Sequence, residues 1–446
     1  MMKLGLFLHG PGQHIASWRA PGIDPAAGMK LSHYVQLAQI GERGLFDFVF
    51  NADTQATFGP DDINVWKRSI VAHRIEPLTL LGALAAVTKH IGLVATATTT
   101  YLEPFHVARI FASLDQLSEG RSGWNLVTSS AAAEALNFSH AAHAAHADRY
   151  DRAAEFAQVV MGLWDTWEDD AFLFDKEAGM FFDPAKLHFL NHKGKHFQVR
   201  GPVMIQRSPQ GRPVIVHAGQ SEAGRALAAQ CAEVVFSVEQ NLEKARAFYA
   251  DLKARAARCG RSPDSILIMP GVQAVVGSSK AEAEDKYEKI QSLIHPELGV
   301  AMLEDMVGMK LSSYPLDGPL PEVPVTNSQQ GRQKVVVEMA RRDNLTIRQL
   351  YKRVAGQRAH RTVCGTASEI ADSLEHWYKS GAADGFNILS VTYPDGLIDF
   401  VDGVIPELQR RGLFRTAYEG KTLRENLGLP RPVNRHVASR RQTAAE

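Results

Sequence analysis

The sequence lacks the features that mark membrane, secreted and nucleic-acid-binding proteins. Its 446 residues include only three cysteines, without CxxC spacing, which indicates a reduced, cytoplasmic compartment rather than a disulfide framework. No window approaches about 20 uninterrupted apolar residues, so we expect no transmembrane helix. The 49 basic side chains balance 49 acidic ones, so net charge favours neither nucleic acid nor a charged membrane as a partner.

Several cofactor and metal motifs are also missing. The chain has neither a Walker loop nor a GxGxxG turn, which argues against a nucleoside triphosphate or a Rossmann-bound dinucleotide. His140, His143 and His146 are spaced three residues apart, but no glutamate completes an HExxH motif. We therefore predict no metal site and interpret this segment as a helix entry with one or two functional histidines.

What the sequence does contain is a series of apolar strands that end in small polar residues. Predicted strands at 45–50, 91–94, 124–127 and 214–216 each run into hydroxyl, amide or carboxylate side chains. Amphipathic helical segments separate most of them. This βα repeat predicts an α/β protein with a (β/α)8 TIM barrel, whose ligand binds at the carboxyl ends of the strands.

The predicted barrel forms one domain over 1–424, with two insertions and a tail. The first insertion, at about 168–212, is rich in aromatic residues, and the second, at about 293–360, has four prolines in its middle. We predict that both lie over the barrel mouth as lids. The polar segment 425–446 is predicted to be a mobile tail.

Polar residues near the strand ends are the candidate ligand-binding groups. Asp53 either fixes a polar ligand or serves as a loop or N-cap carboxylate, and Thr98 lies in a hydroxyl run that β-propensity also explains. Ser221 begins a helix after a small-residue turn, which suits either a phosphate or plain N-capping. His146 and Tyr150, four residues apart, would share one face at another helix start.

Six stretches of the sequence, taken in the order in which they follow one another, resemble those of the bacterial-luciferase-like superfamily. Within that superfamily they are most similar to the nitrilotriacetate, dibenzothiophene-sulfone and pristinamycin synthase group of two-component monooxygenases. Each stretch alone is weak, but together they are specific, and with the segment 386–394 they cover the chain from Met2 to about Gly412. The stretches are 50–53 (FNAD), 93–105 (LVATATTTYLEPF), 114–129 (LDQLSEGRSGWNLVTS), 146–150 (HADRY), 194–202 (GKHFQVRGP) and 213–221 (PVIVHAGQS).

The resemblance implies a luciferase-like barrel, usually a homodimer, that uses reduced FMN (FMNH2) delivered by a separate NAD(P)H:flavin reductase. Reduced FMN and O2 would form a C4a-(hydro)peroxyflavin that inserts one oxygen atom into a small organic substrate. The implied flavin-binding residues are Asp53, Thr98 and Ser129 along the isoalloxazine, and His146, Tyr150 and Ser221 at the ribityl phosphate.

The resemblance leaves the catalytic base, the reaction class and the substrate open. Long-chain alkane-oxidising relatives carry a proposed catalytic histidine where this chain has Ser130, so no catalytic residue is predicted. The alternatives are an F420-dependent oxidoreductase of the same superfamily, a metal-dependent hydrolase, and a flavin-binding protein without turnover. Near strand one, His9, His14, Trp18 and Arg19 are candidate substrate contacts. Arg19 favours an anionic substrate, whereas the phenylalanines of the first insertion favour an apolar one.

Overall fold

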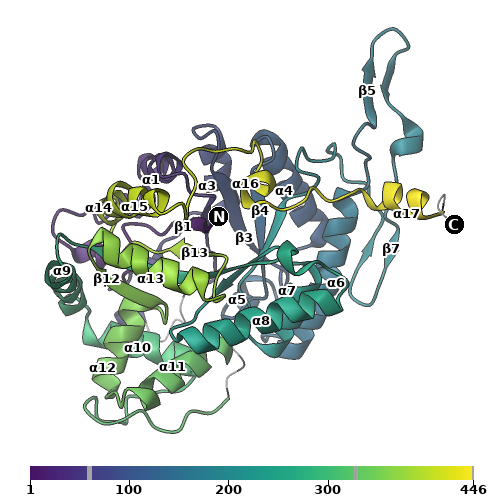
Figure 1. Cartoon of the computed structure of the whole chain (residues 1–446). Coiled ribbons are helices and arrows are strands. Elements are labelled where there is room, and N and C mark those ends of the chain that lie inside the picture. Colours follow the sequence, from purple (N-terminus) through teal and green to yellow (C-terminus); the bar gives the residue numbers. More distant parts are fainter. Residues whose placement is uncertain (58–62, 326, 328–329, 444–446) are drawn as a thin grey trace.

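The computed structural model describes residues 1–57, 63–325, 327 and 330–443 (Figure 1). Within this part of the chain, eight parallel strands close into a barrel, because β1 pairs with both β2 and β13, and β10 pairs with both β9 and β11. The predicted (β/α)8 TIM barrel is therefore confirmed. Its strands are β1 (Lys3–Phe7), β2 (Phe48–Asn51), β3 (Gly92–Thr98), β4 (Ser122–Val127), β9 (Val214–His217), β10 (Val234–Ser237), β11 (Leu267–Val276) and β13 (Gly385–Ile388).

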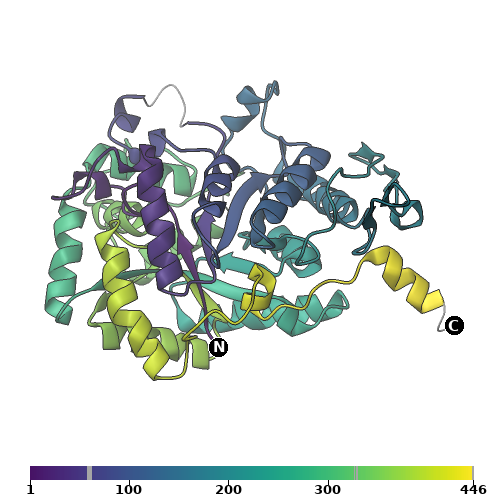
Figure 2. The ribbon, with the colours of Figure 1, turned by 90° about the horizontal axis from the view of Figure 1, so that it is seen from above.

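Helices surround the barrel and return the chain from one end of the strands to the other (Figure 2). Proline at the first helical turn begins both α3 and α4, where the missing N–H is tolerated. None of the described helices is long and apolar enough to cross a bilayer. The surrounding helices are α1 (Leu31–Arg43), α3 (Pro77–Ala85), α4 (Pro104–Leu117), α6 (His146–Trp164), α7 (Glu222–Cys231), α8 (Leu242–Arg258), α9 (Lys280–Ser292), α13 (Ala367–Lys379), α14 (Asp395–Asp399) and α15 (Ile405–Arg410).

The apolar pattern of the sequence predicts neither β12 (Arg361–Gly365) nor α13. Strand β11 has ten residues, and its second half, Val272–Val276, pairs in parallel with β12 beyond the barrel. Four of the five β12 residues are only partly buried, so the strand lacks the continuous apolar run by which the barrel strands are recognised.

The first insertion lies at the amino end of the barrel, so its prediction as a lid over the mouth is wrong. It follows α6, which has already returned the chain to the amino ends of the strands. Ser208 there hydrogen-bonds Asp115 near the end of α4, and the Gln210 amide donates to the carbonyl oxygen of Ser122, the first residue of β4, at 2.8 Å. The insertion forms two hairpins, β5 (Phe172–Asp175) with β6 (Met180–Phe182), and β7 (His192–Lys193) with β8 (Gln198–Val199).

The C-terminal segment packs against the same end of the barrel and is not the mobile tail that its polarity predicts. Leu423 and Leu427 of α16 (Leu423–Leu427) enter the apolar interior of the barrel. Farther along, the buried Asn434 amide donates to the carbonyl oxygens of Asp165 and Trp167 at 3.0 and 2.9 Å. Figures 1 and 2 show α17 (Arg435–Thr443) beside the first insertion.

The second insertion lies at the carboxyl end of the strands. Its helices α10 (Pro296–Val307), α11 (Gln330–Arg342) and α12 (Ile347–Gln357) bury an apolar cluster of their own. Asn327 reaches the start of α6, where its side chain accepts a hydrogen bond from the His146 backbone N–H at 3.1 Å. The insertion therefore borders the barrel mouth.

Candidate functional site

One group of predicted residues is linked by hydrogen bonds across the ends of β2, β3 and β4. The hydroxyl oxygens of Thr98 and Ser129 are 2.9 Å apart. Ser129 also donates to one carboxylate oxygen of the buried Glu134 at 2.5 Å, and Thr54 donates to the other at 3.1 Å. Because Thr54 directly follows Asp53, the network joins three strand ends into one polar wall of the mouth.

Asp53 is a partly buried loop carboxylate and caps no helix in the described structure. Burial raises its pKa to about 6, and the nearby guanidinium of Arg74 offsets part of that rise. Arg74 is held in place by a hydrogen bond from Nη1 to the Ala52 carbonyl oxygen at 3.0 Å. Asp53 is therefore a carboxylate at neutral pH that becomes protonated in mild acid.

The second group of predicted residues gathers where α6 and α7 begin. The ring centroids of His146 and Tyr150 are 4.8 Å apart, as expected for an i, i+4 pair. Ser221 is the N-cap of α7 and accepts from the Gly224 N–H at 3.1 Å, so the capping interpretation is correct. A Cβ atom on Gly219 would lie 3.0 Å from Tyr150 Oη, so the glycine brings the Tyr150 hydroxyl and the turn before α7 together.

This corner has the donor set that a phosphorylated sugar alcohol requires. The N-terminus of α7 and the hydroxyls of Tyr150 and Ser221 supply donors for a phosphate. The carboxylate of Glu222, in the first turn, is already paired with Arg255 at 2.6 Å, which reduces its repulsion of an anion. His217 is buried, its Nδ1 lies 2.7 Å from the Leu126 carbonyl oxygen, and its Nε2 has no partner within the described structure. Burial lowers the pKa of His217, so when Nδ1 carries the proton, Nε2 can accept from a hydroxyl.

The three spaced histidines do not converge. His143 Nδ1 lies 2.6 Å from the Tyr101 hydroxyl, whereas His146 packs on Tyr150. In the part of the chain that the structure describes, no three His, Cys, Asp or Glu side chains are grouped as metal ligands.

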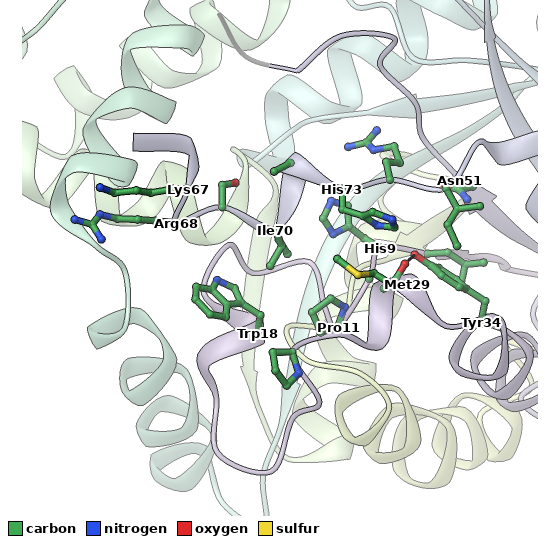
Figure 3. Close-up of a pocket in the computed structure, with 18 residues that line it drawn as sticks. His9, Pro11, Trp18, Met29, Tyr34, Asn51, Lys67, Arg68, Ile70 and His73 are labelled. Atoms are coloured by element: carbon green, nitrogen blue, oxygen red, sulfur yellow. Dashed lines mark hydrogen bonds between the residues drawn. The ribbon is translucent and has the colours of Figure 1, made fainter. Parts of the chain in front are cut away.

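A cavity of about 240 Å³ opens beside the ends of β1 and β2 (Figure 3). His9 and Trp18, two of the four N-terminal candidates, line it. The other two have structural contacts instead: His14 is fully buried with Nε2 3.2 Å from Gln291 Oε1, and Arg19 donates to the Leu293 carbonyl oxygen. Because Arg19 lies outside the cavity, it offers no argument for an anionic substrate.

Sequence reasoning missed several residues of the mouth. Glu134 lies in an alanine-rich stretch with no motif, yet it accepts from both Ser129 and Thr54. Arg358 contacts His9 across a separation of 349 residues, with Nη2 3.3 Å from Nε2. Local sequence offers no signal for such a contact, whereas His217 follows a predicted strand and was identifiable by that position.

Comparison with known proteins places this chain in a family. Residues 11–384 match the family model described as luciferase-like monooxygenase. The chain is 51% identical to N-acetyl-S-(2-succino)cysteine monooxygenase of Bacillus subtilis (strain 168), over 98% of both chains. It is 49% identical to nitrilotriacetate monooxygenase component A of Aminobacter aminovorans, over 97% of both.

Solved structures agree with these relationships. The riboflavin lyase RcaE, whose crystal structure contains modified FMN and riboflavin, superposes with a TM-score of 0.88 at 33% identity, over 98% of both chains. An F420-dependent secondary alcohol dehydrogenase superposes with a TM-score of 0.57 at 16% identity, over 90% of this chain and 98% of that one, and shares the fold alone. The chain therefore belongs to the luciferase-like monooxygenase family and, as its sequence predicts, is a flavin-dependent monooxygenase.

Proposed function

We propose that this monooxygenase uses FMNH2, delivered by a separate NAD(P)H:flavin reductase, to insert one oxygen atom of O2 into a small organic substrate. The observation that carries the proposal is that one barrel mouth contains two separate groups of polar side chains. The corner at α6 and α7 suits a phosphate, and the wall at β2–β4 suits a polar ring. A relative named component A supports a separate reductase.

Each predicted residue has a place in this proposal. Tyr150, Ser221 and His146 hold the phosphate end, and His217 Nε2 accepts from a ribityl hydroxyl. The isoalloxazine lies along the wall formed by Asp53, Thr98 and Ser129. Bound there, FMN supplies the activation of O2, and the chain's own residues orient it and exclude water.

Aromatic side chains keep water out from below the mouth. Phe50 packs between Phe7 and Phe236, with ring centroids 5.1 and 5.6 Å away. All three rings are buried inside the barrel, and His360 stacks on Phe236 at 5.2 Å. This layer forms an apolar floor that limits access of water to the reacting centre from the barrel interior.

The experiment that tests the function is oxygen uptake with and without reductase. We expect the purified protein with FMN and NADH to consume almost no O2, because the chain has no dinucleotide fingerprint. Addition of a flavin reductase should start O2 uptake, with hydrogen peroxide as the product until a substrate is supplied. Rapid oxidation of NADH without reductase would show that the two-component proposal is wrong. Tight binding of F420 but not FMN would favour the alternative cofactor, and bound FMNH2 that never reacts with O2 would indicate a binding protein.

The phosphate corner predicts selective losses of FMN affinity. Tyr150→Phe and Ser221→Ala each remove a donor to a charged group, which costs roughly 1.5–3 kcal/mol, or about 10- to 150-fold in Kd. Riboflavin, which lacks the phosphate, should lose much less affinity in the same fluorescence titration. Ser279→Ala is the matched control, because Ser279 caps α9 through the Glu282 N–H without any phosphate role. Equal losses for both flavins would show that neither hydroxyl reads the phosphate.

The raised pKa of Asp53 predicts a trade-off between stability and binding. The pKa of Asp53 is about 6 in the folded protein and 3.8 ordinarily, so folding favours the protonated side chain. The contribution of the protonated side chain to the free energy of unfolding is fully present below pH 3.8 and is lost as the pH rises through 6. Asp53→Asn should therefore raise Tm of the flavin-free protein by an amount that grows between about pH 4 and 6 and levels off above that, yet weaken FMN binding. Asp24→Asn should instead lower Tm at neutral pH, because a hydrogen bond from Lys30 stabilises the Asp24 carboxylate and lowers its pKa. A Tm difference for Asp53→Asn that does not change with pH would contradict the assignment.

We further propose that the enzyme is a cytoplasmic homodimer in which the β5–β6 hairpin docks on a second copy. The hairpin projects from the body of the protein (Figure 1) and exposes Phe174 at 56% and Phe181 at 64%. A protruding apolar surface is typical of a subunit interface, and NAD(P)H for the reductase is a cytoplasmic reductant. Phe174→Ser with Phe181→Ser should shift the mass measured by light scattering from dimer to monomer. A wild-type monomer, or a dimer that survives both substitutions, would refute this placement.

A further inference from the structure

Positive charge accumulates at the barrel mouth from three separate elements. Arg74 follows β2, Arg332 lies near the start of α11, and Arg358 caps the end of α12. Burial, followed by the charges of Arg74 and Arg332, lowers the pKa of Arg358 to about 9. The guanidinium groups of Arg74 and Arg332 thus act on that of Arg358 in a region partly removed from water.

Arg74 and Arg332 each have a carboxyl group nearby, whereas Arg358 has none among the described residues. Asp53 lies near Arg74 and Asp305 near Arg332, and burial raises the pKa of each carboxyl. Among the described residues, no carboxylate pairs with Arg358. Its Nη2 faces His9 Nε2 at 3.3 Å, and its buried Nε has no partner. A buried cation is ordinarily paired, so Arg358 lacks the negatively charged partner that such a group requires among the described residues.

The described lining of the adjoining cavity has basic side chains but no acidic ones (Figure 3). No Asp or Glu appears among its described lining residues, whereas the basic side chains there are His9, Lys67, Arg68, His73 and Arg74. Arg68 is partly occupied by Glu297 at 3.4 Å, and burial with the charges of Arg358 and Arg74 keeps the pKa of His9 well below its usual value. Trp18, Tyr34 and Met29 supply apolar walls.

The cavity adjoins the proposed flavin wall and has the size of a small-molecule site. Asn51, at the end of β2, and Arg74 line it, and Asp53 of the proposed flavin wall lies next to both. Its volume of about 240 Å³ is below the range of roughly 300–1,000 Å³ common for drug-sized ligands. The cavity therefore suits a small molecule held beside the flavin.

We propose that the substrate is a small organic polyanion, whose carboxylate or sulfonate groups bind Arg74 and Arg358 at this cavity. The assignment of the anion as substrate rests on the proposed function, but the anion site itself does not. Guanidinium forks bind such groups through paired charge-assisted hydrogen bonds, and the bound anion supplies the missing negative charge. A neutral analogue would leave Arg358 unpaired, which disfavours its binding.

Calorimetric titration of the full-length protein, with and without FMN, tests the anion site directly. The probes are propane-1,2,3-tricarboxylate, its uncharged triamide, and ethane-1,2-disulfonate. We expect at least one anion to bind at least tenfold more tightly than the triamide, and to bind more weakly as salt increases. The tighter of the two anions identifies the acidic group.

Variants then locate the site. Arg74→Gln and Arg358→Gln should each weaken anion binding about 10- to 150-fold, and Arg358→Lys should recover part of the loss. Arg348→Gln is the matched control and should stay within about twofold, because Arg348 lies at the other end of α12, exposed and paired with Asp317 at 2.8 Å. Thermal unfolding verifies that each variant is folded.

The outcomes separate this inference from the proposed function. Equal binding of the triamide, no binding of either anion, or full affinity in folded Arg358→Gln and Arg358→Lys proteins would overturn the anion site. Anion binding without any reductase-dependent O2 uptake would leave the site standing and overturn the function. Reductase-dependent O2 uptake without anion binding would leave the proposed function standing and overturn the anion site.

Discussion

Closure of the parallel sheet is the constraint on which the rest of the structure depends. Because all eight strands of the described barrel run in one direction, their carboxyl ends meet at one mouth, and each helix returns the chain to the opposite face. Asp53, Thr98 and Ser129 follow strands separated by whole helices, yet they form one wall. The same geometry sets the place of each insertion: the segment after α6 lies at the amino end, and the segments after β11 border the mouth.

The amino end of the barrel is filled by side chains of the C-terminal segment. At the amino end, Arg424 pairs with the buried Glu233, with Nη2 3.0 Å from Oε2, and Leu423 and Leu427 fill the space beneath the strands. His217 Nε2 and Arg358 Nε at the mouth are buried without partners in the described structure, and so is Arg424 Nε at the amino end. Unsatisfied polar atoms cost stability, and at the mouth a bound ligand would offset that cost by supplying partners.

Burial shifts the pKa values of both acidic and basic side chains at the mouth. Loss of water raises the pKa of Asp53 and lowers the pKa of Arg358, because burial disfavours each ionised form. Mutual repulsion among the arginines adds to the second shift. The apolar floor formed by Phe7, Phe50 and Phe236 maintains this low-dielectric environment. Flavin phosphate and an anionic substrate would bind at separate places in this one mouth.

The sequence by itself determined the barrel, because strand periodicity, proline at helix starts and polar strand ends are local signals. Polar strand ends also marked candidate ligand-binding residues, and the resemblance to the luciferase-like family gave them their proposed flavin roles. Thr98 and Ser129 meet because adjacent parallel strands end side by side. Tertiary structure alone decided that Arg358 meets His9 and that Arg19 does not face the cavity. It also decided that the first insertion and the C-terminal segment pack at the amino end. These outcomes depend on where long connections dock, and docking is set by complementary surfaces that no short window of sequence contains.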